Sequence, residues 1–267
     1  MQGFKRKRIE KTLSKIFFDG KAMILACDQG FEHGPKDFNI QNINPDYVFN
    51  IALEGRFDAI AVQAGIAEKH YQDKFRKIPL IVKLNAKTRF DKKDPVSRQH
   101  TSVAYAKKIG AAGVGYTIYL GSINEQEMFV EFGKICEEAH DLGLFAMCWM
   151  YPRGSSIEHE FDTDIISYGA RIAMELGADI VKVKNNGDVQ GMNWVVSSAG
   201  KTRVVVAGGS KQDSVSFGNE ITKILQAGVV GLAVGRNVWQ DDKPLDVANE
   251  LYNIIHPPII KDNLPKK

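Results

Sequence analysis

The sequence predicts an α/β fold, a single-domain (β/α)₈ barrel of the TIM-barrel type. Eight short apolar runs recur along the 267 residues, with helical stretches between them. The same sequence pattern precedes several of these runs: a helix ends at Gly, and small residues then lead into the apolar run, as in KKIGAAGVGYTI and MELGADIVKVK. Eight such units of roughly 22 to 35 residues are typical of this barrel.

The expected strands are apolar runs of a length that suits buried parallel strands. In chain order they are 23–28, 58–63, 79–84, 113–118, 143–149, 179–184, 203–207 and 230–235. A doubly wound open sheet is the alternative, but no Gly-x-Gly-x-x-Gly motif follows the first run. In a barrel the active site lies beyond the carboxyl ends of the strands, so the ends of these runs supply the site candidates.

No Pro/Ser-rich linker divides the chain, so one domain is expected over 1–267, with a helical segment over 1–20 and a tail over 256–267. Lys and Arg number 35 and Asp and Glu 32, and a net charge of +3 favours neither nucleic acid nor a membrane as partner. No stretch resembles a signal peptide or a membrane span, so a cytoplasmic location is expected. The scattered His and Cys residues predict no metal site, and no cofactor is expected.

The sixth expected strand carries two lysines on one face. In Ile180-Val181-Lys182-Val183-Lys184 the two-residue period places both lysines opposite the valines. The valines suit the side that faces the helices, so the lysines would point into the barrel, where burial and a neighbouring like charge favour the neutral amine. A neutral amine attacks a carbonyl and forms a Schiff base. The alternative is a pair that reaches solvent or is salt-bridged inside, and the spacing does not separate Lys182 from Lys184.

The fifth expected strand ends in aromatic residues. Met147, Trp149 and Tyr151 share one face by the same alternation, and Pro152 is expected to lie beyond the end of the run. Tyr151 at the rim is suited to moving protons for a neighbouring imine, and Trp149 to excluding water. Aromatic filling of the core is the alternative.

The first expected strand leads directly into ionisable and turn residues. Asp28 follows the strand, where a carboxylate stabilises a protonated imine or exchanges protons with a substrate hydroxyl. The alternative for Asp28 is a helix cap or turn former. His33 is expected to contribute hydrogen bonds at the site rather than catalysis.

Glycine-rich loops follow the seventh and eighth strands, where barrels most often bind phosphate. Gly208, Gly209 and Ser210 form the first loop, and Gly235 and Arg236 the second. Glycine lets backbone amides approach an anion, and an arginine binds phosphate oxygens bidentately, whereas ordinary turns are the alternative. A further cation, Lys83, ends the third strand and is expected to receive a second phosphate or to lower the pKa of the reactive lysine.

Six short motifs run along the chain: 28–35 (DQGFEHGP), 82–88 (VKLNAKT), 115–119 (GYTIY), 149–154 (WMYPRG), 179–182 (DIVK) and 234–239 (VGRNVW). With them the chain, roughly from Phe18 to Tyr252, resembles the archaeal-type class I fructose-bisphosphate aldolases, within a wider group that includes deoxyribose-phosphate aldolase. The resemblance implies a Schiff base on Lys182, with Tyr151 as proton shuttle, Asp28 as its acid–base assistant and Trp149 lining the sugar.

The same resemblance implies that Arg236 and the glycine loops bind the dihydroxyacetone-phosphate end of the substrate, with Arg153 among the substrate-binding residues. It also implies a homo-oligomer, often a decamer, and a reaction of glycolysis or gluconeogenesis: the reversible cleavage of fructose 1,6-bisphosphate to dihydroxyacetone phosphate and glyceraldehyde 3-phosphate. No metal takes part in the implied reaction.

The chain departs from that family at two places. GGSK stands at 208–211 where the family usually has GGPK, and NNGD at 185–188 where it has YTGD, which leaves the exact sugar phosphate open. One alternative is the transaldolase-type synthase that makes 2-amino-3,7-dideoxy-D-threo-hept-6-ulosonate for aromatic amino acids. The other is a sugar-phosphate sensor without chemistry.

Overall fold

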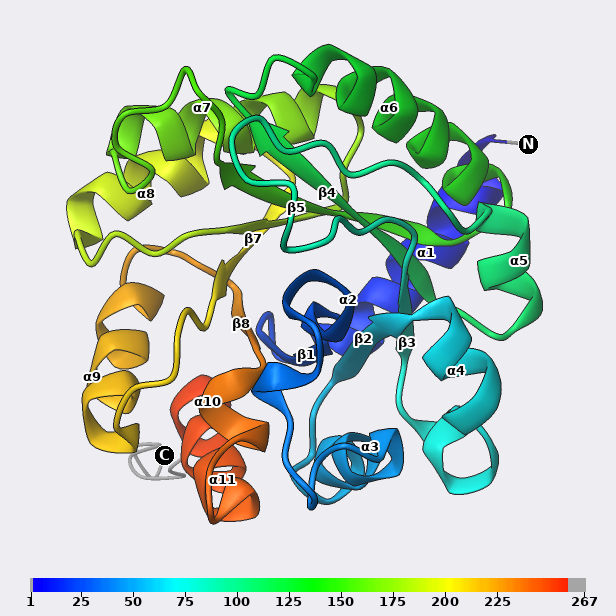
Figure 1. Cartoon of the computed structure of the whole chain (residues 1–267), viewed down its shortest axis with the longest axis vertical. Coiled ribbons are helices and arrows are strands. Elements are labelled where there is room, and N and C mark those ends of the chain that lie inside the picture. Colours follow the sequence, from blue (N-terminus) through cyan, green and yellow to red (C-terminus); the bar gives the residue numbers. More distant parts are fainter. Residues whose placement is uncertain (1, 259–267) are drawn as a thin grey trace, which may run out of the picture.

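The computed structural model describes residues 2–258, which fold into a closed barrel of eight parallel strands in chain order (Figure 1). The strands are β1 (Ala22–Cys27), β2 (Ala59–Gln63), β3 (Leu80–Lys83), β4 (Gly113–Leu120), β5 (Phe145–Pro152), β6 (Ile180–Val183), β7 (Arg203–Ala207) and β8 (Gly231–Val234). Because β1 pairs with both β2 and β8, the sheet has no edge. The predicted barrel and all eight expected strands are confirmed, and the open sheet is excluded.

Helices surround the strands, as Figure 1 shows. The longer ones are α3 (Pro45–Glu54), α4 (Ala64–His70), α5 (Val103–Lys108), α6 (Glu125–Asp141), α7 (Thr163–Glu175), α8 (Val189–Ser198), α9 (Ser214–Leu225) and α11 (Pro244–Ile255). Short helical turns follow β1, β2 and β8: α2 (Gln29–His33), η1 (Pro35–Asp37), η2 (Asp73–Lys77) and α10 (Arg236–Trp239). Of the expected tail over 256–267, residues 259–267 lie outside the described part of the chain.

The expected N-terminal helical segment is α1 (Gln2–Ile16), which covers the N-terminal end of the barrel. Its apolar side chains Ile9, Leu13 and Ile16 are buried against inward-pointing strand residues, including Ala22 and Ile24 of β1. Burial of this stripe closes the barrel floor, so the open end of the barrel is the one at the carboxyl ends of the strands.

The barrel interior follows the predicted alternation. Val181 and Val183 belong to the apolar layer between strands and helices, whereas Met147, Trp149 and Tyr151 belong to or pack on the cluster inside the barrel. The inward positions therefore carry the large aromatic side chains of β5 up to the mouth.

Two glycines of β4 make room for those aromatics. A Cβ on Gly113 would lie 2.3 Å from the Phe145 ring, and one on Gly115 would lie 2.3 Å from the Trp149 ring. Glycine at these positions lets the two rings fill the barrel interior across from the neighbouring strand.

The fifth strand is longer than predicted. The sequence indicated an end before Pro152, but β5 stays paired with β4 up to Leu120 opposite Pro152. Proline at the last strand position loses no ladder bond that the strand needs, and the Arg153 amide then donates to the Leu120 carbonyl at 2.9 Å. Tyr151 is consequently a strand residue with a fixed backbone.

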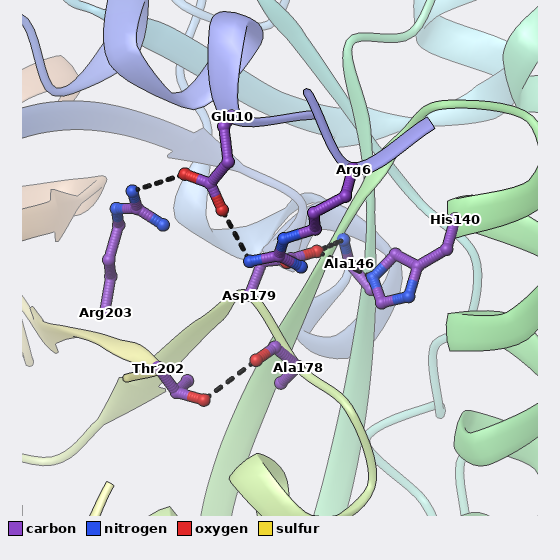
Figure 2. A network of polar contacts seen from close by, with 8 residues as sticks. All are labelled: Arg6, Glu10, His140, Ala146, Ala178, Asp179, Thr202 and Arg203. Atoms are coloured by element: carbon purple, nitrogen blue, oxygen red, sulfur yellow. Dashed lines mark hydrogen bonds and ion pairs between the residues drawn. The ribbon is translucent and has the colours of Figure 1, made fainter. Parts of the chain in front are cut away.

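A polar network holds α1 to the start of β6 (Figure 2). The buried Asp179 carboxylate accepts from Arg6 Nη1 at 2.6 Å and from the Ala146 amide at 2.9 Å, and lies 2.9 Å from His140 Nε2. Glu10 continues the network because it binds both Arg6 and Arg203. The aspartate of the DIVK motif thus anchors the barrel floor, at the opposite end of β6 from Lys182.

Candidate active site

A cavity of about 490 Å³ opens at the carboxyl ends of the strands. Its walls come from the loops after β1, β5, β6, β7 and β8, the end of the barrel where enzymes of this fold place their sites. Eleven of the twelve residues that the sequence indicated line this cavity: Asp28, His33, Trp149, Tyr151, Arg153, Lys182, Gly208, Gly209, Ser210, Gly235 and Arg236.

Lys182 lies on the inner face of β6 with only 6 % of its surface exposed. Its Nζ is 5.5 Å from the centre of the Trp149 ring, and within residues 2–258 no carboxylate reaches ion-pair distance of it. Burial lowers the pKa of the Lys182 ammonium to about 8; Lys83 and Arg236 lower it as well, while Asp28 and Glu32 oppose the shift. An appreciable fraction of this amine is therefore neutral near neutral pH, as a nucleophile requires.

Lys184 also faces the cavity, but it has a different environment. Its ammonium forms an ion pair with Glu160 from the loop after β5 and lies 4.7 Å from the centre of the Phe161 ring. Burial lowers the pKa of Lys184, whereas Glu160 acts in the opposite direction. The carboxylate therefore distinguishes two lysines that strand alternation left equivalent.

Lys83 is the predicted site residue that does not line the cavity. It is 1 % exposed, its Nζ donates to the Asn85 carbonyl at 3.1 Å, and Asp28 Oδ2 lies 3.6 Å away. The structure encloses this ammonium and does not bring it to the cavity wall, so the expectation that Lys83 receives a phosphate gains no support from it. Its position suits the other expectation, since Lys83 lowers the pKa of Lys182.

Tyr151 faces the cavity from the last inner position of β5. Burial raises the pKa of its phenol well above the usual value, and the nearby Asp28 and Glu32 carboxylates raise it further. The hydroxyl is thus a protonated phenol across the working pH range. Arg153, two residues on, holds its guanidinium 6.0 Å from the centre of the Tyr151 ring.

Tyr119 and Glu32 form a polar pair beside Tyr151 that sequence reasoning did not single out as functional. Tyr119 lies opposite Tyr151 in the β4–β5 register, and its hydroxyl donates to Glu32 Oε1 at 3.0 Å. The expected strand ended at residue 118, so Tyr119 fell outside it. The alternation Gly115, Thr117, Tyr119 was the signal that places Tyr119 on the inner face.

The glycine loops are joined by a buried asparagine. Asn237 Nδ2 donates to the Gly208 and Ser210 carbonyls at 2.5 and 3.0 Å, and Asn237 Oδ1 accepts from the Gln212 amide at 2.8 Å. This side chain, 4 % exposed, fixes the loop after β7 to the start of α10. A polar residue directly after Gly235-Arg236 was the only sequence signal for it.

His33 lines the cavity and its Nδ1 lies 2.6 Å from Asp37 Oδ2, which agrees with the expected hydrogen-bonding role. The departures from the family pattern are also tied into the structure. Asn185 donates to Glu220 at 2.5 Å, and Gln212 donates to the same carboxylate at 2.9 Å, so the loops after β6 and β7 share one acceptor.

No helix within 2–258 combines the length and the apolar character that crossing a membrane demands. In the same range, no three His, Cys, Asp or Glu side chains are grouped so as to hold a metal ion.

Comparisons with known proteins agree with this arrangement. Residues 22–241 match the model of the DeoC/LacD family aldolases. A Thermoproteus tenax protein named fructose-bisphosphate aldolase class 1 is 42% identical, over 92% of this chain and 94% of its own. A 2-amino-3,7-dideoxy-D-threo-hept-6-ulosonate synthase 1 of Archaeoglobus fulgidus is 34% identical, over 92% and 90%.

Among solved structures, an archaeal fructose-1,6-bisphosphate aldolase, described as having its catalytic Lys covalently bound to the carbinolamine intermediate of the substrate, superposes with a TM-score of 0.89. It is 41% identical, and the match covers 93% of this chain and 99% of that one. On the family match and these identities, the chain belongs to the DeoC/LacD family aldolases.

Proposed function

We propose that this protein is a class I fructose-bisphosphate aldolase, which reversibly cleaves fructose 1,6-bisphosphate into dihydroxyacetone phosphate and glyceraldehyde 3-phosphate. The observation that carries the proposal is Lys182, a buried amine of lowered pKa that faces a cavity bordered by two glycine loops and Arg236. The names of the Thermoproteus tenax relative and of the archaeal aldolase structure support this choice of reaction over that of the more distant synthase.

In the proposed reaction the neutral Lys182 amine attacks the C2 ketone to give a carbinolamine, which loses water to form a protonated imine. The imine accepts the electron pair of the C3–C4 bond, so an enamine forms as that bond breaks. The C4 hydroxyl loses its proton with the help of Tyr151 and becomes the aldehyde of glyceraldehyde 3-phosphate. Protonation of the enamine at C3 and hydrolysis of the imine release dihydroxyacetone phosphate.

The cavity wall supports a division of tasks around Lys182. Trp149 lies against the Lys182 ammonium and keeps water from the imine, while Asp28 contributes negative charge that stabilises its protonated form. Gly208, Gly209 and Ser210, together with Arg236, border the side of the cavity where one phosphate would bind. Arg153 is a second cation of the cavity wall that can attract the anionic substrate.

Borohydride trapping tests the central step. Incubation with dihydroxyacetone phosphate and borohydride, followed by peptide mass spectrometry, is expected to give a reduced adduct on Lys182 and none on Lys184. The Lys182→Met variant should give no adduct and should lose cleavage in a coupled assay with fructose 1,6-bisphosphate. Phosphate binding without an adduct would instead favour a sensor, and an adduct without cleavage would favour the synthase.

We further propose a cytoplasmic location, a role in glycolysis or gluconeogenesis, and a homo-oligomer, with a decamer as the expected size from the family. Light scattering coupled to size-exclusion chromatography tests the oligomer directly. A mass equal to one chain would exclude it.

A further inference from the structure

The cavity holds two carboxylates close to Lys182, and their surroundings differ. Asp28 Oδ2 lies 3.6 Å from the buried ammonium of Lys83, so a fixed cation offsets its charge. Glu32 has no cationic side chain within ion-pair distance among the residues that the structure describes, and its hydrogen bond comes from the neutral phenol of Tyr119. Of the two, Glu32 keeps the more available negative charge.

Glu32 and Tyr151 also line the same cavity. The β4–β5 register puts Tyr119 and Tyr151 opposite each other on the inner face, and both rings lie about 6 Å from the Arg153 guanidinium, at 5.9 and 6.0 Å. Because Tyr119 holds Glu32 at 3.0 Å, the carboxylate lies at the level of this tyrosine pair, where it lines the same cavity wall as Tyr151.

Tyr151 alone cannot remove the C4 hydroxyl proton. Burial and the nearby carboxylates raise the pKa of its phenol, so it enters the reaction with its own proton in place. A protonated phenol accepts a proton only if it gives up its own at the same time, which requires a base within reach.

We infer that Glu32 is that base, acting through Tyr151, and that Tyr119 positions it. As the C3–C4 bond breaks, its electron pair moves into the imine, the C4 hydroxyl proton passes to the Tyr151 oxygen, and the Tyr151 proton passes to the Glu32 carboxylate. The later protonation of the enamine at C3 runs the relay backwards, so Glu32 returns to its ionised form and no external acid or base is consumed. This inference rests on the proposed aldolase function.

Tyr119 contacts Glu32 directly, and the other charged or titratable side chains that line the cavity are Asp28, His33, Tyr151, Arg153, Glu160, Lys182, Lys184, Lys211, Glu220 and Arg236. The experiment below distinguishes the role of Glu32 from that of Lys182. Imine formation with dihydroxyacetone phosphate needs the Lys182 amine, but it does not require removal of a C4 proton.

The test compares Glu32→Gln with the unmodified enzyme. Glutamine keeps the size of the side chain and an oxygen that accepts from Tyr119, but it cannot take a proton. We expect kcat for fructose 1,6-bisphosphate cleavage to fall about 100-fold or more, with KM changed less than about threefold and borohydride trapping on Lys182 unchanged.

Two variants complete the experiment. Tyr119→Phe keeps the base but removes the hydrogen bond that positions it, so a smaller loss of kcat than for Glu32→Gln is expected. Glu158→Gln, at an exposed residue of the loop after β5 that does not line the cavity, should behave as the unmodified enzyme.

Two outcomes would overturn the inference: Glu32→Gln with kcat within threefold of normal, or a Glu32→Gln enzyme that also fails to trap the imine. If the unmodified enzyme itself gives no adduct on Lys182, the proposed function fails, which is a result distinct from both.

Discussion

At the scale of single residues, the site depends on how each charge is compensated. Lys182 forms no ion pair among the described residues and lies beside Trp149, whereas Lys184 is paired with Glu160. Lys182 lies on β6 and Lys184 directly follows that strand, and both side chains line the cavity, so their different environments come from side chains elsewhere in the sequence.

Alternation along the expected strand 179–184 was sufficient to direct both lysines toward the cavity, because a period of two is a property of a strand itself. It could not identify the reactive one, since Glu160 reaches Lys184 from an irregular loop whose path no local pattern fixes. The family resemblance chose Lys182, and the ion pair at Lys184 supplies a physical reason for that choice.

Lys83 offers a prediction at this scale. Replacing Lys83 with Met removes a positive charge that lowers the pKa of Lys182, and it also frees Asp28, which raises that pKa. Less Lys182 is then neutral at pH 7, so the rate of borohydride trapping should fall several-fold and recover as the pH rises. The exposed Lys134→Met variant on α6 should show no shift of the pH profile.

If the pH profile of trapping for Lys83→Met coincides with that of the unmodified enzyme, the charge of Lys83 does not lower the pKa of Lys182. The comparison isolates the charge, because methionine is close to the length of the lysine stem.

At the scale of elements, neighbouring strands and loops fix the positions of the active side chains. Gly115 of β4 leaves room for the Trp149 ring of β5, and Asn237 joins the loop after β7 to α10. The existence and order of the strands followed from the apolar runs, while the ends of β4 and β5 did not, because they depend on pairing between the two strands. Tyr119 was missed for that reason.

The Gly115→Ala change tests the fit between β4 and β5. Its Cβ would lie 2.3 Å from the Trp149 ring, so the indole must shift toward Lys182. We expect the free energy of unfolding to fall by about 1 to 3 kcal/mol and kcat/KM to fall about 10- to 100-fold, measured by denaturant titration and by the coupled assay. The control is Gly133→Ala on α6, where a Cβ meets nothing within 4 Å.

Asn237→Ala tests the join between the phosphate loops. Loss of the three Asn237 hydrogen bonds frees the loop at 208–212, so the ligand must order it on binding. KM for fructose 1,6-bisphosphate should rise about tenfold with a smaller change in kcat. Asn219→Ala, at an exposed position of α9, is the matched control. An unchanged KM for Asn237→Ala would show that the loop at 208–212 does not contribute to substrate binding.

At the scale of the whole molecule, ionic contacts at the barrel floor connect parts of the chain that are far apart in sequence. Asp179 binds Arg6 and His140, and His256 after α11 contacts both Asp19 and Asp58. The sequence predicted α1 and the barrel but not these contacts, since a charge pattern does not state which distant partner it meets.

The Asp179 carboxylate should make the free energy of unfolding depend on pH in the acidic range. Burial alone would raise the pKa of its carboxyl, but hydrogen bonds from His140 and the Ala146 amide, with Arg6, hold it below 3.8 in the folded state. A lowered folded pKa gives stability that is present above the unfolded value and lost as the pH falls through the folded one. Asp179→Asn should lower the free energy of unfolding by about 2 kcal/mol at pH 7, with the difference shrinking below pH 4.

His256 should give the opposite pH dependence, with a contribution to stability that is lost as the pH rises. Burial tends to lower its pKa, but Asp58 and Asp19 raise it above 6.5 overall. A raised folded pKa gives stability that is complete below the unfolded value and lost as the pH rises through the folded one. Denaturant titrations between about pH 5.5 and pH 9 span the usual histidine pKa. Over this range the free energies of unfolding of His256→Gln and of the unmodified protein should converge at the alkaline end. A constant difference across this range would exclude the ion pairs as its cause.

The arrangement of α1 bears on how the protein is made. This helix precedes all eight strands in the chain, so it leaves the ribosome before them, and Asp179 lies 173 positions after its partner Arg6. Until β6 has been synthesised, the nascent helix has no carboxylate to bind and only part of the apolar surface that covers Ile9, Leu13 and Ile16. Such a delay leaves an apolar surface exposed during translation, when chaperones bind unfinished chains.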